Sequence, residues 1–102
     1  MVRINWTIQA KYDLKSIAEY ISRDSKRYAK LQVVKIKTKT KILKSHIKIG
    51  KMVSEIDNRN IRELIEGNYR IIYKIVSKDQ VDILTLHHTS RDLSKRSLMK
   101  KC

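Results

Sequence analysis

Two arginines and two adjacent histidines in the second half of the chain are the side chains best suited to chemistry on an anionic substrate. Arg62 and Arg70 lie within IRELIEGNYRIIYKIV, residues 61–76, and His87 and His88 end the next apolar run. The planar fork of a guanidinium can clamp a phosphate or a carboxylate, and an exposed histidine can exchange a proton near neutral pH. The simpler interpretations are a surface ion pair for an arginine and a strand-end hydrogen bond for a histidine.

The sequence contains no motif that is typical of a metal site or a cofactor site. Cys102 is the only cysteine, which excludes a cysteine-rich zinc site and an internal disulfide. His87 and His88 are neighbours on a predicted strand and point to opposite sides of it, so they make a poor metal pair. The chain also lacks the HExxH, phosphate-loop, GxGxxG and Ser-His-Asp patterns. We therefore expect no metal and no cofactor.

The net charge predicts an anionic partner. The chain carries 24 Lys and Arg against 10 Asp and Glu, a formal net charge of +14. A field of this size attracts RNA, DNA, ribosomes or an acidic protein, without indicating which. The alternative interpretation is a lysine-rich surface that only faces solvent.

The length and composition predict one small domain, residues 1–102, with no linker, because there is no proline and there are only two glycines. No apolar run approaches the roughly 20 residues of a membrane span. The first ten residues have a strand pattern and not that of a signal peptide. With a lone terminal cysteine, the cytoplasm is the expected compartment.

The first half of the chain predicts one strand and two helices. Residues 2–6 alternate apolar and polar side chains as a half-buried strand does. Thr7 can cap a helix over 7–24, in which apolar residues recur at helical spacing. A second helix over 25–46, capped by Ser25, would complete a helical hairpin.

The second of these helices is ambiguous in the sequence. KIKTKTKI alternates with period two and contains β-branched residues, which favour a strand. Some twenty residues without a turn signal favour a helix, and we give length the greater weight. The helix would carry two exposed lysine stripes, Lys37, Lys41 and Lys44 in one, Lys35 and Lys39 in the other.

The second half predicts a sheet. Period-two patterns indicate strands over 51–56, 61–66, 68–76 and 81–88, and Thr89 or Ser90 can begin a short C-terminal helix. The order β-α-α-β-β-β-β-α predicts an α+β fold of two layers, in which the helical hairpin packs on an antiparallel sheet.

A two-residue turn at Gly67 and Asn68 fixes the register of the central hairpin. Arg62 then faces Tyr73, on the more apolar face that we assign to the core, and Arg70 lies on the opposite, open face. We expect a diagonal ion pair between Arg70 and Glu63. Arg62 is expected at the margin of the sheet, paired with Glu55 or with an acid at a helix end.

Together these segments resemble the RelE/ParE superfamily of bacterial toxins from type II toxin–antitoxin modules. The matching motifs are AxxDLxxIxxYI at 10–21, SKRYA at 25–29, IGxxVxE at 49–55, IRELxxGNYRIIYKI at 61–75 and ILTLHHTSRDL at 83–93. They cover nearly the whole chain, and their combination is more specific than any one of them. The resemblance implies a helical hairpin on an antiparallel sheet, and growth inhibition that an acidic, partly disordered antitoxin relieves by wrapping the toxin in a hetero-oligomer.

Two branches of the superfamily differ in chemistry. RelE-like members cut mRNA on the ribosome, and Arg70 matches the arginine that they use on the phosphate. However, Ile61 and Glu63 stand where RelE has two lysines, and no tyrosine follows Tyr73. Residues 88–93 resemble the C-terminal segment of ParE-like members, which inhibit DNA gyrase. The resemblance is therefore closer to the ParE-like branch.

Three hypotheses follow: a ParE-like poison of DNA gyrase, a RelE-like mRNA endonuclease, and an inactive relic that only binds its antitoxin. In the nuclease hypothesis, the catalytic residues would be Arg70, His87 and His88. The candidate residues for binding the target or the antitoxin are Arg62, Arg70, Tyr73, His88, Arg91, Asp92 and Leu93.

Overall fold

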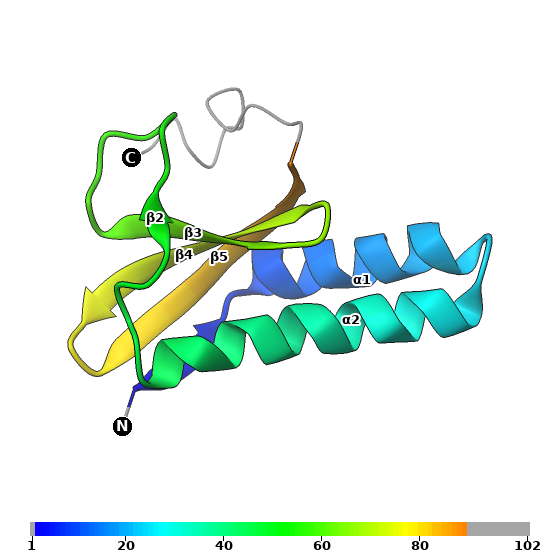
Figure 1. Cartoon of the computed structure of the whole chain (residues 1–102), viewed down its shortest axis with the longest axis horizontal. Helices are drawn as coiled ribbons and strands as arrows, with labels where there is room; N and C mark the ends of the chain where they lie inside the picture. Colours follow the sequence, from blue (N-terminus) through cyan, green and yellow to red (C-terminus); the bar gives the residue numbers. More distant parts are fainter. Residues whose placement is uncertain (1, 90–102) are drawn as a thin grey trace.

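Two helices cover one face of a five-stranded sheet in the computed structural model, which describes residues 2–89 (Figure 1). The elements are β1 (Arg3–Trp6), α1 (Ile8–Ser22), α2 (Lys26–Thr40), the 3-10 turn η1 (Lys41–Lys44), β2 (Lys51–Met52), β3 (Ile61–Glu66), β4 (Tyr69–Ser77) and β5 (Gln80–His88). This arrangement confirms the two-layer α+β fold. The helix predicted after Thr89 or Ser90 lies outside the described residues.

Both helices begin at the predicted caps. The side chain of Thr7 accepts a hydrogen bond from the Ala10 amide, and that of Ser25 from the Tyr28 amide. The second helix is shorter than predicted, because α2 ends at Thr40 and the chain continues as the tighter η1 turn. Thr40 Oγ1 donates to the Lys37 carbonyl, and such side-chain bonds, together with weak helix formers, destabilise a last helical turn.

The sheet is mixed, whereas the sequence predicted it to be antiparallel. Its strand order is β1-β5-β4-β3-β2, and β1 pairs in parallel with β5 while every other pair is antiparallel. Period-two alternation identifies a strand but not its direction. The two helices between β1 and the rest of the sheet let β1 enter beside β5 in the parallel sense.

The strand predicted at 51–56 is also shorter, since β2 contains only Lys51 and Met52. Val53 and Ile56 instead pack with Ile61 and Ile72 on the sheet face that the helices leave uncovered. The apolar side chains that suggested a longer strand thus cover this face, which the sequence predicted to be open.

Beyond the end of β1, residues of α1 and its cap provide the hydrogen-bond partners along the edge of β5. Thr7 Oγ1 donates to the carbonyls of Ile83 and Leu84, and one carboxylate oxygen of Asp13 accepts from the Leu86 amide and the Thr85 hydroxyl. Backbone groups at a sheet edge need partners when they are partly buried. Asp13 therefore supplies what a neighbouring strand would otherwise provide.

The register of the central hairpin agrees with the prediction. Arg62 pairs with Tyr73, Leu64 with Ile71 and Glu66 with Tyr69. Leu64, Ile71 and Tyr73 belong to the main core beneath α1 and α2, which confirms that this face of the hairpin is the core side.

Candidate functional site

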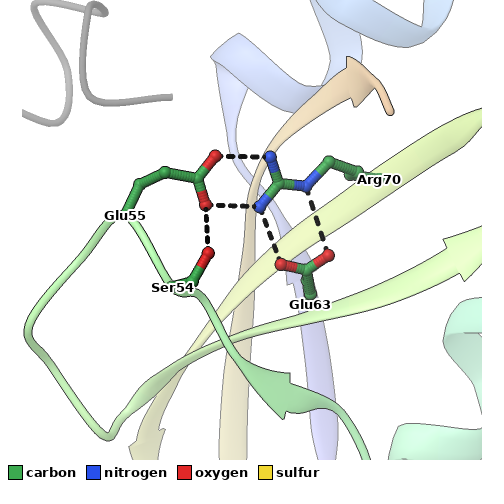
Figure 2. A network of polar contacts seen from close by, with 4 residues as sticks. All are labelled: Ser54, Glu55, Glu63 and Arg70. Atoms are coloured by element: carbon green, nitrogen blue, oxygen red, sulfur yellow. Dashed lines mark hydrogen bonds and ion pairs between the residues drawn. The ribbon is translucent and has the colours of Figure 1, made fainter. Parts of the chain in front are cut away.

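Arg70 lies at the centre of a buried network of charges (Figure 2). Its Nη1 is 2.7 Å from Glu55 Oε2, and its Nη2 is 2.7 Å from Glu63 Oε2. Nη2 also donates to Glu55 Oε1 at 2.9 Å, and Nε donates to Glu63 Oε1 at 3.2 Å. At least four of the five N–H donors of the guanidinium are thus engaged by two carboxylates.

Three different segments bring these side chains together. The β3–β4 register places Glu63 diagonally across from Arg70, so the predicted pairing is confirmed. Glu55 comes from the segment after β2, where Ser54 Oγ donates to its carboxylate. The expectation of a surface pair on an open face was wrong, because the side chains of Arg70 and Glu63 are only 8% and 5% exposed.

The electrostatics hold Arg70 in its charged form. The hydrogen bond to Glu55, followed by the interactions with Glu63, raises the pKa of Arg70 despite its burial. His87, also buried, is its register partner on β5. A guanidinium enclosed in this way ties the 53–56 segment to the sheet, and its donors point at protein carboxylates and not at a space for a phosphate.

On the other face of the hairpin, Arg62 and Tyr73 each make hydrogen bonds to the backbone of residues 47–50. Arg62 Nη1 donates to the Gly50 carbonyl at 2.9 Å. The Tyr73 hydroxyl donates to the Ile47 carbonyl at 2.9 Å and accepts from the Gly50 amide at 3.0 Å. The predicted ion pair of Arg62 with Glu55 was wrong, since Glu55 lies on the opposite face and binds Arg70.

Gly50 is required for this contact. A Cβ at position 50 would lie 2.6 Å from the Glu63 carbonyl oxygen and 2.7 Å from the Tyr73 ring. Only a residue without a side chain allows the backbone so close an approach. Arg62, Tyr73 and Gly50 therefore fix the 47–50 segment against the sheet.

The two histidines have different environments, as their alternation on a strand predicts. His87 is buried beside Arg70, and His88 is exposed at the end of β5. The ring of His88 meets the ring of Tyr69 edge-on, with centroids 5.9 Å apart. The remaining candidates, Arg91, Asp92 and Leu93, lie outside the described residues.

Neither a metal site nor a membrane span is present in the described part of the chain. Between residues 2 and 89, no three His, Cys, Asp or Glu side chains are close enough together to hold a metal ion. No helix in the same range is long and apolar enough to cross a bilayer.

Sequence reasoning missed two of the acidic residues that organise these contacts. Glu55 was assigned to Arg62, and Asp13 appeared only within a family motif. A partial signal existed for each. Asp13 immediately precedes Leu14 in the AxxDLxxIxxYI motif, and Glu55 closes the IGxxVxE motif.

Comparisons with known proteins agree with the resemblance. The family model described as the ParE toxin of the type II toxin–antitoxin system parDE matches residues 4–93. A search of curated proteins finds no match. Among solved structures, a chain of the chromosomal ParDE TA system from P. aeruginosa has a TM-score of 0.73 and 22% sequence identity, covering 88% of this chain and 98% of that one. This likeness supports the two-layer fold.

Proposed function

Because the chain belongs to the ParE toxin family of type II toxin–antitoxin systems, we propose that it inhibits growth by poisoning DNA gyrase. The family also implies an antitoxin as its partner, and we propose that this antitoxin is acidic, which suits the net charge of +14.

The observation that best supports a gyrase poison over a nuclease is the engagement of Arg70 by Glu55 and Glu63. A nuclease needs a cation directed at the position where charge develops on the phosphate. Here two carboxylates surround the cation and would repel that phosphate. Arg70 then serves as a framework residue, and the target is a protein surface.

The direct test is a supercoiling assay with purified toxin and DNA gyrase. We expect inhibition at micromolar toxin. Primer extension on mRNA from cells that express the toxin should reveal no new cleavages. New cleavages without gyrase inhibition would instead support the nuclease hypothesis, and normal growth after induction without antitoxin would support the inactive relic.

We further propose that His88, together with residues 91–93, contacts the target. His88 is exposed and its ring is held against Tyr69, and a pre-positioned aromatic side chain is typical of an interface anchor. His88→Ala should weaken gyrase inhibition about tenfold without changing the melting temperature. His46→Ala is the matched control, since His46 is exposed in the segment between η1 and β2 and its ring nitrogen lies within hydrogen-bond distance of the neighbouring Ser45 hydroxyl.

A further inference from the structure

Exposed tyrosines gather at one end of the molecule. The helical hairpin extends past the β3–β4 turn (Figure 1), and Tyr20 in the last turn of α1 and Tyr28 in the first turn of α2 belong to that end. These two residues are 67% and 55% exposed. Large rings grouped on the surface of a small protein typically mark a place where a partner binds.

Tyr69 brings the sheet into the same group. It begins β4 directly after the turn that contains Gly67. Burial, followed by the phenol groups of Tyr20 and Tyr28, raises the pKa of Tyr69, so the three hydroxyls lie within electrostatic reach of one another. Gln32, one turn after Tyr28, lies against the same turn, since its amide would be 3.9 Å from a Cβ at position 67. Three elements therefore contribute tyrosines to one surface.

A guanidinium and an imidazole extend this group. The Arg23 guanidinium carbon lies 5.8 Å from the centre of the Tyr20 ring, and the ring of His88 meets that of Tyr69 edge-on. Both arrangements are attractive. They restrict the rings before any partner arrives, which lowers the entropy cost of binding. We call this surface the tyrosine cluster and define it as Tyr20, Arg23, Tyr28, Tyr69 and His88.

The charge around the tyrosine cluster is nearly balanced. Residues 19–28 contain three Lys and Arg and two acids, and Glu66, the register partner of Tyr69, adds a third acid. Residues 29–54, in contrast, contain eight lysines and no acid. A polyanion would be drawn to that second region. Tyrosine and arginine with little lysine is the composition of the core of a protein–protein interface.

We propose that the tyrosine cluster is the surface on which DNA gyrase docks, with the rings of Tyr20 and Tyr28 packed against an apolar, uncharged patch of that protein. The inference rests on the proposed function, because it takes gyrase from there. The phenol hydroxyls and the Arg23 guanidinium can donate hydrogen bonds to backbone carbonyls around such a patch. The cluster includes His88, so the proposed contact of His88 with the target becomes part of one continuous surface.

Two other occupants match the tyrosine cluster less well. A single strand of nucleic acid can stack its bases on exposed rings, but its phosphates would meet the neighbouring acids Glu19, Asp24 and Glu66. A second copy of this chain would bring another net charge of +14 and be repelled. An uncharged protein surface meets neither obstacle.

The first experiment compares two tyrosines of the same helix. Tyr12 and Tyr20 both lie on α1 and are both 67% exposed, but Tyr12 is outside the cluster. Affinity for purified DNA gyrase is measured by surface plasmon resonance, and inhibition of supercoiling is measured on the same preparations. We expect Tyr20→Ala to weaken both by at least about tenfold and Tyr12→Ala by less than about threefold.

Tyr28→Ala provides an independent test from the other helix. Since Tyr28 is exposed, the variant should keep the melting temperature of the wild type and still lose at least about tenfold in gyrase affinity. The loss should also be independent of salt, because contacts of neutral rings are not screened. We expect the ratio of wild-type to variant affinity to change by less than about threefold between about 50 and 200 mM salt, a range over which phosphate contacts weaken steeply.

The outcomes separate this inference from the proposed function. Gyrase binding by the wild type, with equal effects of Tyr12→Ala and Tyr20→Ala, would overturn the inference and leave gyrase as the target. Unchanged gyrase affinity, with loss of affinity for the antitoxin or for a single-stranded oligonucleotide, would assign the cluster to that partner and overturn the inference as well. A wild-type toxin that does not bind gyrase would refute the proposed target and the docking surface together.

Discussion

The two faces of the sheet are covered in different ways. On one face α1, α2 and η1 bury a large apolar core that includes Ile36, Leu43 and Ile71. On the other face, within residues 2–89, the short 53–56 segment supplies Val53 and Ile56, and the buried Arg70 network lies beside them.

The difference indicates how the short 53–56 segment can be held in place on its face of the sheet. Dispersion and hydrophobic contacts tolerate small adjustments, whereas a buried guanidinium requires its carboxylates at defined positions. The face covered by residues 53–56, called the loop-covered face below, therefore has less buried apolar area and depends more on the exact positions of a few charged groups. The free energy of unfolding should be more sensitive to the loss of one side chain on this face than on the helix-covered face.

The largest effect is expected from Arg70→Ala. It would leave Glu55 and Glu63 partly or fully buried without their cation, and breaking a buried ion pair typically costs about 3–5 kcal/mol. Arg62→Ala, on the helix-covered face, removes a hydrogen bond to the Gly50 carbonyl and should cost only about 1–2 kcal/mol. Urea unfolding of both variants measures the free energies of unfolding.

Arg70→Lys refines the same contrast. An ammonium keeps the charge but cannot engage both carboxylates with parallel hydrogen bonds. Its unfolding free energy should fall between those of the wild type and Arg70→Ala. If Arg70→Ala were no more destabilising than Arg62→Ala, the network would not be what holds the loop-covered face.

Gly50→Ala is expected to have the next largest effect. The added methyl group would meet the Glu63 carbonyl oxygen at 2.6 Å, and overpacking against backbone should cost about 2–3 kcal/mol. Gly67→Ala is the control, because Gly67 has a φ of 59° but a Cβ there would meet only the Gln32 amide, at an ordinary contact distance of 3.9 Å, and left-handed backbone costs about 1–2 kcal/mol. Thermal unfolding followed by circular dichroism would compare the two. A smaller effect at Gly50 than at Gly67 would contradict the proposed close approach.

Tyr73→Phe should be less destabilising. It keeps the ring but removes the bonds to the Ile47 carbonyl and the Gly50 amide, at a cost of about 1–2 kcal/mol. Comparison with Arg62→Ala tests whether the two side chains fix the 47–50 segment together. In a double-mutant cycle, simple additivity of the two effects would indicate that they act independently.

The smallest effect concerns alkaline pH. Burial raises the pKa of Tyr73 above its ordinary value of 10.0, so the folded state holds this proton more tightly than the unfolded state. The resulting stability is complete below pH 10 and is lost as the pH rises through the folded-state pKa. Tyr73→Phe should therefore show a shallower loss of stability above pH 10 in denaturant titrations. An identical slope in the variant would exclude Tyr73 as a source of the effect.

Local signals predicted the central hairpin well. Gly67 and Asn68 fix a two-residue turn, and period-two alternation then determines which side chains share a face. From these two facts follow the pairs Arg62–Tyr73 and Leu64–Ile71 and the diagonal contact of Arg70 with Glu63. The beginnings of the two helices, at the caps Thr7 and Ser25, were predictable from equally local signals, because each depends on one hydroxyl and the first turn of the helix.

Features that depend on distant packing were not predictable in this way. Glu55 comes from an irregular segment, and nothing in its own neighbourhood indicates which arginine it will reach. The direction of β1 is set by how the helical hairpin crosses the sheet, and the short β2 by apolar side chains that turn away to cover a face. Alternation alone cannot distinguish that cover from a strand.

The parallel pairing of β1 with β5 also affects how the protein folds during synthesis. Arg3 pairs with Gln80 and Trp6 with Ile83, so the edge of the sheet joins residues separated by almost eighty positions. Such long-range pairs form late and slow folding. The two helices can form early, but Trp6 and Leu14 lack much of their core until β5 has left the ribosome. We therefore expect a nascent chain that stops before Gln80 to expose apolar surface and to be a substrate for chaperones.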